Sequence, residues 1–521
     1  MQPRCDVGDG HPSIFSAILG VGAVVACAFI LAWPLFGGMI AINDDIKFIR
    51  VPAHSQPITK QIATAWTSSP SFRPLEILVA AGCDERTLAC PTVMPVQAIG
   101  MALLIAAVFA IARITLPNRP WVAPIALMWI SISPSTTFSL WQMDACSQTW
   151  SAALGSWAFV LCWRSLLAAK SGRIAWRFLA LLTLVMLIGV NIKETFYGWS
   201  AGIGIVFIGA LLRLLVTDRN AALRGAIALL PVVALPLAHA FLRWRFGGLL
   251  HAPDSAVDSR YTMELGMNLF NNAVHSIAGS IGTGSFALLV DDHAPWVLRG
   301  LPILAALAEL ALLVAVVEFC VLHHGRQAWL RYGPVAAFLA AAFISLGVTL
   351  PMSSVSELYS FGANVSFGVL LGVVITELWN EPSVEAHRIT RAVAVICGSM
   401  VLSIGLYGLV CRAQQSHHLW KCAAAANEQI ISFMDSRPDP KPYQAAPMSI
   451  LLFEEPYRME RSYGAFIMPT AQALAMIHTM EWMNQLHPRH ITTMSYELPS
   501  ATPTPYELLI DCNSMSKANS W

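Results

Sequence analysis

The chain has 521 residues, of which 56% are hydrophobic and only 12% are charged, whereas soluble domains carry roughly 25% charged residues. Its formal net charge is +1, so it has neither a basic excess that would attract nucleic acid nor an acidic tail. The composition therefore excludes a nucleic-acid-binding protein and predicts one whose main solvent is the lipid bilayer.

Long apolar segments recur from residue 13 to residue 410. A helix needs about 20 mostly apolar residues to cross the roughly 30 Å hydrocarbon core of a membrane. The first segment is too long for a cleaved signal peptide, so we interpret it as a helix. We predict about eleven transmembrane helices, at residues 13–40, 92–116, 121–140, 146–163, 175–190, 198–215, 222–241, 298–322, 335–350, 361–379 and 392–411.

Basic residues in the short loops predict the orientation, because they resist translocation across the membrane. They collect on alternate loops, in the order Arg113, Arg119, Arg164, Lys170, Arg173, Arg177, Arg213, Arg219, Arg224, Arg326, Arg331, Arg388 and Arg391. We expect the N-terminus to be cytoplasmic and the C-terminus to lie outside. The compact loops favour a bacterial inner membrane. The larger outer pieces are then loops 43–91 and 243–299 of a transmembrane domain, residues 1–411, and an extracytoplasmic domain, residues 412–521.

The composition changes after residue 411. A helix is expected at residues 417–435, followed by a proline-rich linker at residues 436–447. Short apolar runs then predict strands at 449–453, 491–496 and 507–511, with a helix at 470–485. The predicted fold class is an all-α polytopic membrane protein with a small C-terminal α/β domain.

Four of the eleven cysteines fall in predicted outer segments. An oxidising outer compartment would allow Cys83 to pair with Cys90, and Cys422 with Cys512. No CxxC pair or histidine spacing suggests zinc. The run Asp291-Asp292-His293 resembles a divalent-cation ligand set only weakly, since such runs are common in solvated loops. We assign no metal and no cofactor, and leave a divalent cation, Mg²⁺ or Mn²⁺, open.

The first outer loop begins with Asn43-Asp44-Asp45. One interpretation is that Asn43 or Asp44 caps a short interfacial helix. The other is that a carboxylate acts as general base on an acceptor hydroxyl at the lipid–water boundary. A single base suffices for an inverting transfer, because a lipid-phosphate leaving group needs charge stabilisation more than protonation. Asp44 is the first candidate and Asp45 the second.

Two further motifs offer cations at the same face. Arg73 precedes Pro74, which starts a helix well, and its planar guanidinium matches a phosphate. The alternative for Arg73 is a structural salt bridge to Glu76 or to the Asp44-Asp45 pair. Lys193 and Glu194 follow the fifth predicted span, where Lys193 could neutralise a phosphate and Glu194 orient it or hold an acceptor or a metal. The alternative is a snorkelling lysine beside a capping carboxylate.

Weaker candidates lie in the other outer loops. Glu357 and Tyr359 lie between two late spans, where depth and an aromatic neighbour favour substrate binding over a solvated loop. Asp144 is a candidate substrate-binding acid, although a helix N-cap explains it as well. Arg243 begins the second large loop and is a third candidate for the donor phosphate.

The order of these motifs resembles the GT-C class of membrane glycosyltransferases, which includes protein O-mannosyltransferases and lipid A aminoarabinose transferases. The acid pair at Asp44 and Asp45, Phe72-Arg73-Pro74-Leu75, Lys193-Glu194 and Glu357-Leu358-Tyr359 occur in the order seen in that class. Those enzymes use polyprenyl-phosphate sugars and an acid in the first outer loop, which Asp44 and Asp45 match. The resemblance extends to about residue 380, through motifs of only a few residues each.

The chain also departs from that class. Relatives have Glu-Arg-Tyr where this chain has Glu357-Leu358-Tyr359, and their Ser-Gly-Arg stretch is replaced around residues 141–148. The phosphate would then be met by Lys193, Arg73 or Arg243. The C-terminal segment resembles no domain that we can name.

The resemblance implies an enzyme that transfers a hexose from a polyprenyl-phosphate donor to an extracytoplasmic glycan, lipid or protein, with inversion. Two alternatives stay open. One is a secondary transporter, which would place charges near the bilayer midplane and contain internal repeats. The other is a glycan ligase or polymerase with a lipid-diphosphate donor, which would rely on Arg243, His251 and Arg260 and not on Asp44.

Overall fold

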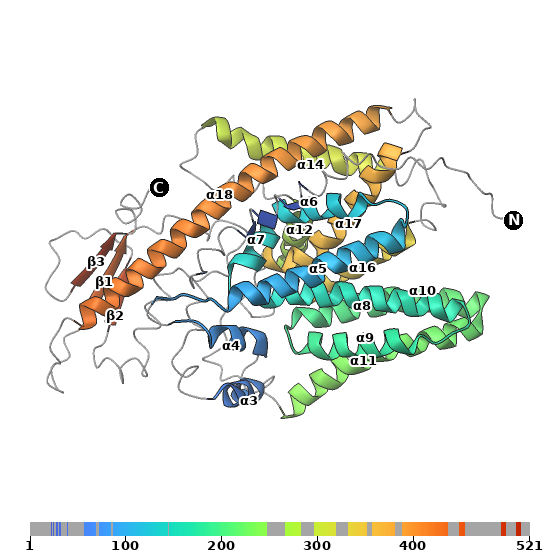
Figure 1. Cartoon of the computed structure of the whole chain (residues 1–521), viewed down its shortest axis with the longest axis horizontal. Helices are drawn as coiled ribbons and strands as arrows, with labels where there is room; N and C mark the ends of the chain where they lie inside the picture. Colours follow the sequence, from blue (N-terminus) through green and yellow to red (C-terminus); the bar gives the residue numbers. More distant parts are fainter. Residues whose placement is uncertain are drawn as a thin grey trace.

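A computed structural model describes most of the helical part of the chain (Figure 1). The described residues are 22, 24, 25, 28, 29, 31, 32, 39, 57–68, 72–84, 87–143, 145–246, 266–282, 296–318, 332–351, 357–380, 388–435, 448–453, 491–495 and 507–511. Of the first predicted span, the described residues between 22 and 32 are helical.

Within the described residues, six helices are long and apolar enough to cross a membrane. They are α5 (Val93–Thr115), α8 (Cys146–Lys170), α10 (Thr195–Thr217), α11 (Arg219–Phe246), α17 (Phe361–Asn380) and the first part of α18 (Arg388–Asp435). Shorter apolar helices are α6 (Val122–Ile132), α9 (Trp176–Val190) and α16 (Gly333–Ser345), and α14 (Trp296–Glu318) lies beside α18. Their outward faces carry large apolar side chains such as Leu212 and Leu230. Helices of this kind define an integral membrane protein.

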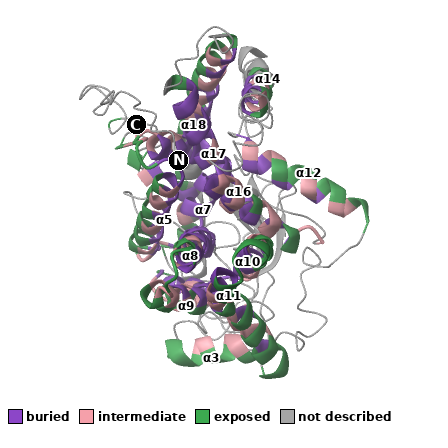
Figure 2. Cartoon of the chain, turned by 90° about the vertical axis from the view of Figure 1, so that its right-hand side faces the viewer, coloured by how far each residue is buried: buried purple, intermediate pink, exposed green. Residues whose placement is uncertain are grey.

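Two helices form the interior of the bundle (Figure 2). The apolar windows of α8 and α17 are 72% and 83% buried, whereas those of α10 and α11 are 28% and 33% buried. Phe159 of α8 packs against Phe207 of α10 and Phe338 of α16, with ring centroids 5.7 and 5.1 Å apart. The core therefore lies between α8, α10, α16 and α17, and the outer helices present their apolar faces to the surrounding medium.

A pair of glycines brings α10 and α16 into close contact. A Cβ atom at Gly198 would lie 2.3 Å from the carbonyl oxygen of Ser345, and one at Gly202 would lie 2.1 Å from that of Ala341. Small residues four positions apart let two helix backbones approach closely in a membrane. This contact fixes the position of the first turn of α10, which carries site residues described below.

The span predicted at residues 121–140 is two helices. Helix α6 ends before Ser133, and α7 (Pro134–Trp141) begins with Pro134. Ser133 is extended, with φ −72° and ψ 138°, because a following proline disfavours the helical conformation. The predicted span at 335–350 likewise ends early, and α16 continues as the single 3₁₀ turn η6 (Leu346–Val348).

The helices predicted at 392–411 and 417–435 form one continuous helix, α18. The composition changes at residue 412, but the segment 409–435 contains neither glycine nor proline, so nothing in the sequence stops the helix. The expected domain boundary at residues 411 and 412 thus falls inside α18. The expected strands are present as β1 (Met448–Phe453), β2 (Ile491–Ser495) and β3 (Glu507–Asp511), in a parallel sheet of order β2-β1-β3. The helix predicted at 470–485 lies outside the described residues.

The two large loops that are predicted to lie outside contain helices of their own. Helices α3 (Ile58–Ser68) and α4 (Pro74–Ala80) belong to the first loop, and α4 begins at Pro74 as predicted. Helix α12 (Met267–Ile281) in the second loop was not predicted. Its polar side faces the protein: the Asn272 side chain donates to the Leu350 carbonyl at 2.9 Å, and Asn364 donates to the Ser280 carbonyl at 2.9 Å. Its exposed side carries Met267, Phe270, Val274 and Ile277.

Candidate functional site

Three segments that are far apart in the sequence meet at the end of the bundle where α8 and α10 begin. Arg73 and Glu76 come from the start of α4, Lys193 and Glu194 from the short connection between α9 and α10, and Ser147 from the first turn of α8. Pro74 occupies the first turn of α4, where the backbone has no use for the missing N–H group. Pro74 therefore starts α4 immediately after Arg73 and places Glu76 one turn further along.

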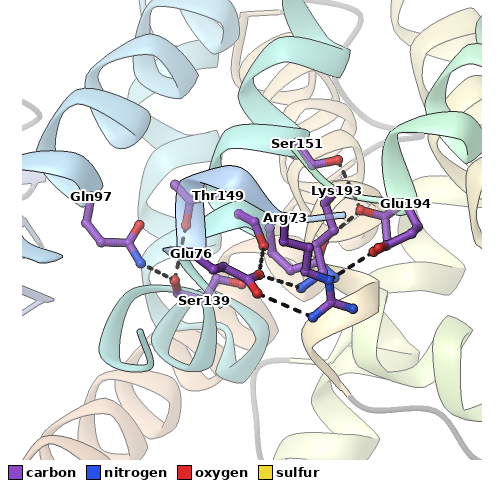
Figure 3. A network of polar contacts seen from close by, with 11 residues as sticks. Arg73, Glu76, Gln97, Ser139, Thr149, Ser151, Lys193 and Glu194 are labelled. Carbon is purple, nitrogen blue, oxygen red and sulfur yellow. Dashed lines mark hydrogen bonds and ion pairs between the residues drawn. The ribbon is translucent and has the colours of Figure 1, made fainter. Parts of the chain in front are cut away.

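The charged side chains of these segments form one network (Figure 3). Arg73 Nε donates to Glu194 Oε2 at 3.0 Å, and Arg73 Nη1 lies 3.5 Å from Glu76 Oε2. Lys193 Nζ lies 3.7 Å from Glu76 Oε1, to which the Ser147 hydroxyl also donates. Glu76 thus joins the two predicted cations, Arg73 and Lys193, which are 120 residues apart in the sequence.

The members of this network differ in burial. The side chains of Glu76 and Lys193 are 0% and 2% exposed, that of Arg73 is 14% exposed, and that of Glu194 is 37% exposed. Two positive and two negative groups balance in charge, which is how buried ions are held at tolerable cost. Glu194 is the most accessible of the four, so it is the carboxylate that can leave the network with the least rearrangement.

Glu194 lies at the start of α10, outside the membrane-spanning residues. Burial raises the pKa of its carboxyl, but the nearby charges of Arg73 and Lys193 lower that pKa more, and the pKa is lowered overall. One carboxylate oxygen, Oε2, accepts from Arg73. The other, Oε1, has no hydrogen-bond partner among the described residues. The group is therefore an ionised carboxylate with spare acceptor capacity.

A cavity lies directly beside this network. The described residues that line it come from adjacent ends of α8, α10, α16 and α17 and from the adjoining turns, and they are Gln148, Ala152, Thr195, Trp199, Ser345, Leu346, Thr349, Tyr359 and Gly362. Counting the part open to solvent, its volume is about 320 Å³, at the lower end of small-molecule pockets. Thr195, which follows Lys193-Glu194 in the chain, connects the charged network to this cavity.

Arg243 has a different setting. Its side chain is 2% exposed, and its Nη1 donates to the carbonyl of Trp66 at 2.8 Å, near the end of α3. Its guanidinium also lies 5.3 Å from the ring centroid of Trp66 and 5.4 Å from that of Phe72. A cation at a helix C-terminus complements the helix dipole. Arg243 thus holds α3 beside the Phe72-Arg73 segment, and its role as a phosphate ligand stays a prediction.

Tyr359 lines the cavity described above. Glu357 belongs to the 3₁₀ turn η7 (Glu357–Ser360), and its side chain lies outside the described part of the chain. The candidate acids Asp44, Asp45 and Asp144 also lie outside the described residues. Their assignment stays a prediction.

Cys83 and Cys90 form a disulfide within the first outer loop. The amide of Cys90 also donates to the carbonyl of Met39 at 2.7 Å, which ties the end of this loop to the end of the first predicted span. Met39 lies five residues before Asp44. Of the other candidate pair, the side chain of Cys422 and all of Cys512 lie outside the described residues.

Sequence reasoning missed the central position of Glu76, which it considered only as a partner for Arg73. The signal was present in Arg73-Pro74-Leu75-Glu76, since residues three apart at a helix start lie on one side. It also missed Glu309, a carboxylate near the middle of α14 that is 8% exposed. A buried acid in an apolar helix is costly and is therefore a further functional candidate.

The described residues contain no group of three or more His, Cys, Asp or Glu side chains that could hold a metal ion. Asp291-Asp292-His293 and the acids at residues 44 and 45 are not among those residues. Whether a divalent cation takes part stays open.

No protein-family model and no curated protein sequence matches the chain. Its fold is similar to that of ArnT from Cupriavidus metallidurans bound to undecaprenyl phosphate, with a TM-score of 0.47 and 13% identity over 97% of this chain and 91% of ArnT. ArnT in the apo state has a TM-score of 0.43 and 14% identity, over 91% of this chain and 90% of that one. The Archaeoglobus fulgidus oligosaccharyltransferase in the apo form has a TM-score of 0.44 and 13% identity, over 84% of this chain and 63% of its own.

These neighbours are of the GT-C kind that the motif order resembles.

Proposed function

We propose that the protein is a membrane glycosyltransferase that moves a sugar from a polyprenyl-phosphate donor to an acceptor on the outer side of the membrane. The observation that carries this proposal is the meeting of Arg73 and Lys193 at one end of the bundle, beside a polar cavity. Arginine offers a planar fork to a phosphate and lysine a point charge, and together they stabilise a phosphate leaving group.

The donor phosphate replaces a carboxylate of the charged network when it binds. Arg73 and Lys193 are neutralised by Glu76 and Glu194, so an added phosphate brings an excess of negative charge. Glu194 is the accessible carboxylate of the two, and it turns away from Arg73 as the phosphate takes over its hydrogen bonds. Glu76, which is fully buried, stays in place and keeps both cations at the site.

The acceptor is activated by an acid of the first outer loop. Asp44 takes the proton of the acceptor hydroxyl as that oxygen attacks the anomeric carbon, and the bond from this carbon to the phosphate oxygen breaks. The leaving phosphate remains an anion beside Arg73 and Lys193. One displacement of this kind inverts the anomeric centre. Asp45 is the second candidate for the base.

The remaining features belong to the same proposal. About eleven spans cross a bacterial inner membrane, with the N-terminus in the cytoplasm. The strands β1, β2 and β3 belong to an extracytoplasmic α/β domain that begins beyond the membrane-spanning part of α18. Glu194, Glu357, Tyr359 and Asp144 contribute to substrate binding.

No described residue favours the alternatives more strongly. A lipid-diphosphate ligase would rely on Arg243, which is occupied by α3 and its aromatic neighbours. A transporter would concentrate ionisable groups near the bilayer midplane, whereas Arg73 and Lys193 meet at one end of the bundle.

The activity is tested in cells that lack this protein, complemented with wild type or Asp44→Asn at equal expression. Mass spectrometry of envelope glycolipids and glycoproteins should show a hexose-sized increment with wild type and none with Asp44→Asn. If both proteins restore the increment, Asp44 is not the base, and Asp45 as the base or a glycan ligase is favoured instead. An increment with neither would contradict a glycosyltransferase and direct the next test to transport.

Donor binding is tested separately with purified protein and undecaprenyl phosphate. Arg73→Lys should weaken binding roughly 10- to 100-fold, the usual size for hydrogen bonds to a charged group. Arg213→Lys is the matched control, because Arg213 is exposed near the opposite end of α10. Equal affinities for the two variants would refute the phosphate role of Arg73.

A further inference from the structure

The cavity beside the charged network combines several features that the phosphate site does not use. Among the described residues, nine line it and none of them is an acid or a base, although the cavity adjoins the cations Arg73 and Lys193. Its polar groups are the neutral side chains of Gln148, Thr195, Ser345, Thr349 and Tyr359. A ligand that fits here carries neutral groups that both donate and accept hydrogen bonds.

Gln148 supplies a donor that is fixed in direction and that no described residue pairs with. Its side chain is 5% exposed. Thr195 Oγ1 donates to Gln148 Oε1 at 3.1 Å, and the Ser151 hydroxyl lies 3.1 Å from Thr195 Oγ1. These contacts set the orientation of the amide and leave Nε2 as the free end, which has no hydrogen-bond partner among the described residues. A buried unsatisfied N–H group is costly unless a ligand or water meets it.

The cavity lies next to the proposed phosphate site. Thr195 follows Lys193 and Glu194 directly, so the cavity begins where the charged network ends. A molecule whose phosphate lies on Arg73 and Lys193 extends its next group toward Gln148. On a polyprenyl-phosphate sugar, that next group is the sugar ring.

We infer that this cavity is the donor-sugar subsite and that the sugar it selects is uncharged. The inference rests on the proposed function and narrows the donor to neutral hexoses, because a cationic aminosugar or an anionic uronic acid would find no counter-charge among the described lining residues. Gln148 Nε2 donates to a ring hydroxyl, and the hydrogen bond from Thr195 to Gln148 Oε1 keeps the amide in this orientation. The enclosed part of the cavity has room for about one water molecule, so the sugar ring would occupy the open part of the roughly 320 Å³ cavity.

The test uses the full-length protein in lipid nanodiscs and three probes: undecaprenyl phosphate, its glucosyl ester and its aminoarabinosyl ester. Wild type should bind the glucosyl ester about tenfold more tightly than undecaprenyl phosphate, the gain expected from one well-placed hydrogen bond with its donor otherwise unsatisfied. Gln148→Leu should abolish that gain and leave the affinity for undecaprenyl phosphate unchanged. The aminoarabinosyl ester should bind no better than undecaprenyl phosphate.

Gln97→Leu is the matched control. Gln97 is also a buried glutamine of the bundle, but it donates to the Ser139 carbonyl at 2.6 Å and does not line the cavity. It should keep the preference for the glucosyl ester. If Gln148→Leu fails to fold, Thr195→Val removes the hydroxyl that orients the amide while Gln148 remains, and it should reduce the preference several-fold, less than loss of the hydrogen bond itself.

The possible failures differ from one another. An unchanged preference in Gln148→Leu or Thr195→Val, or tighter binding of the aminoarabinosyl ester, would overturn the neutral-sugar subsite while undecaprenyl phosphate still binds through Arg73. No measurable binding of any probe, with Arg73→Lys indistinguishable from wild type, would overturn the proposed function and the subsite together.

Discussion

Replacing Glu76 with glutamine should lower the free energy of unfolding by about 3 kcal/mol, the smaller end of the range for removing one partner of a buried ion pair. Glu76 is completely buried and lies 3.5 Å from Arg73 Nη1 and 3.7 Å from Lys193 Nζ. Glutamine keeps the shape and an oxygen that accepts from Ser147, so the change removes the charge alone. Lys193, 2% exposed, then loses the carboxylate beside its ammonium group.

The matched control is Glu194→Gln. Glu194 also contacts Arg73, at 3.0 Å, but its side chain is 37% exposed, and ion pairs open to solvent contribute about 1 kcal/mol or less. Both variants are compared with wild type by equilibrium unfolding in mixed micelles. A difference of about 2 kcal/mol between them corresponds to roughly a 30-fold difference in the unfolding equilibrium.

A double variant separates charge from packing. Lys193→Met removes the ammonium group and keeps much of the side-chain stem, so Glu76→Gln combined with Lys193→Met should be more stable than the sum of the single changes predicts. If Glu76→Gln is no more destabilising than Glu194→Gln, or if the double variant is strictly additive, the buried network does not hold the site together as described.

Other predictions concern the helix contacts, the disulfide and the response to acid. Gly202→Ala should destabilise the protein by roughly 1–3 kcal/mol through overpacking against α16, whereas Gly209→Ala in the same helix, with nothing within 4 Å of the added Cβ, should be neutral or slightly stabilising; thermal unfolding distinguishes them. Removing the Cys83–Cys90 disulfide by serine substitution should cost about 2.5 kcal/mol, from the short loop it closes, and should abolish the effect of a reductant on the melting temperature. The pKa of Glu194 is lowered in the folded state, so its contribution to stability is present above its ordinary pKa of 4.5 and is lost as the pH falls below it. Between about pH 7 and about pH 3, the melting temperature of wild type should therefore fall further than that of Glu194→Gln. An equal fall in both proteins would contradict the ion pair with Arg73.

The helical content of the membrane part could be predicted from the sequence, because a segment of about 20 apolar residues has few stable conformations in lipid other than a helix. The segments 92–116 and 361–379 match α5 and α17 closely. The predicted helix boundaries were wrong at two places where the composition of the segment did not decide the end of the helix. Proline ended a helix at Ser133 although the segment is apolar, and α18 continued past residue 412 although it becomes polar there.

The candidate site, too, could be predicted from the sequence only in part. Arg73, Lys193 and Glu194 were identified from the sequence because charged residues at a membrane boundary are costly and need a reason to be there. Their partners could not be identified in that way. Glu76 joins Arg73 to Lys193 across 120 residues of chain. Gln148 becomes an oriented donor only because the Thr195 hydroxyl, from another helix, donates to its amide oxygen.

The sequence by itself determined that the protein lies in a membrane, that its long apolar segments are helical and which charged motifs stand near their ends, since these depend on local composition and on the length of apolar runs. Only the tertiary structure decided which motifs meet. The close approach of α10 to α16 at Gly198 and Gly202 and the seating of α4 on α8 bring the charged network and the neutral cavity together. That arrangement depends on contacts between residues distant in the chain, which no local pattern records.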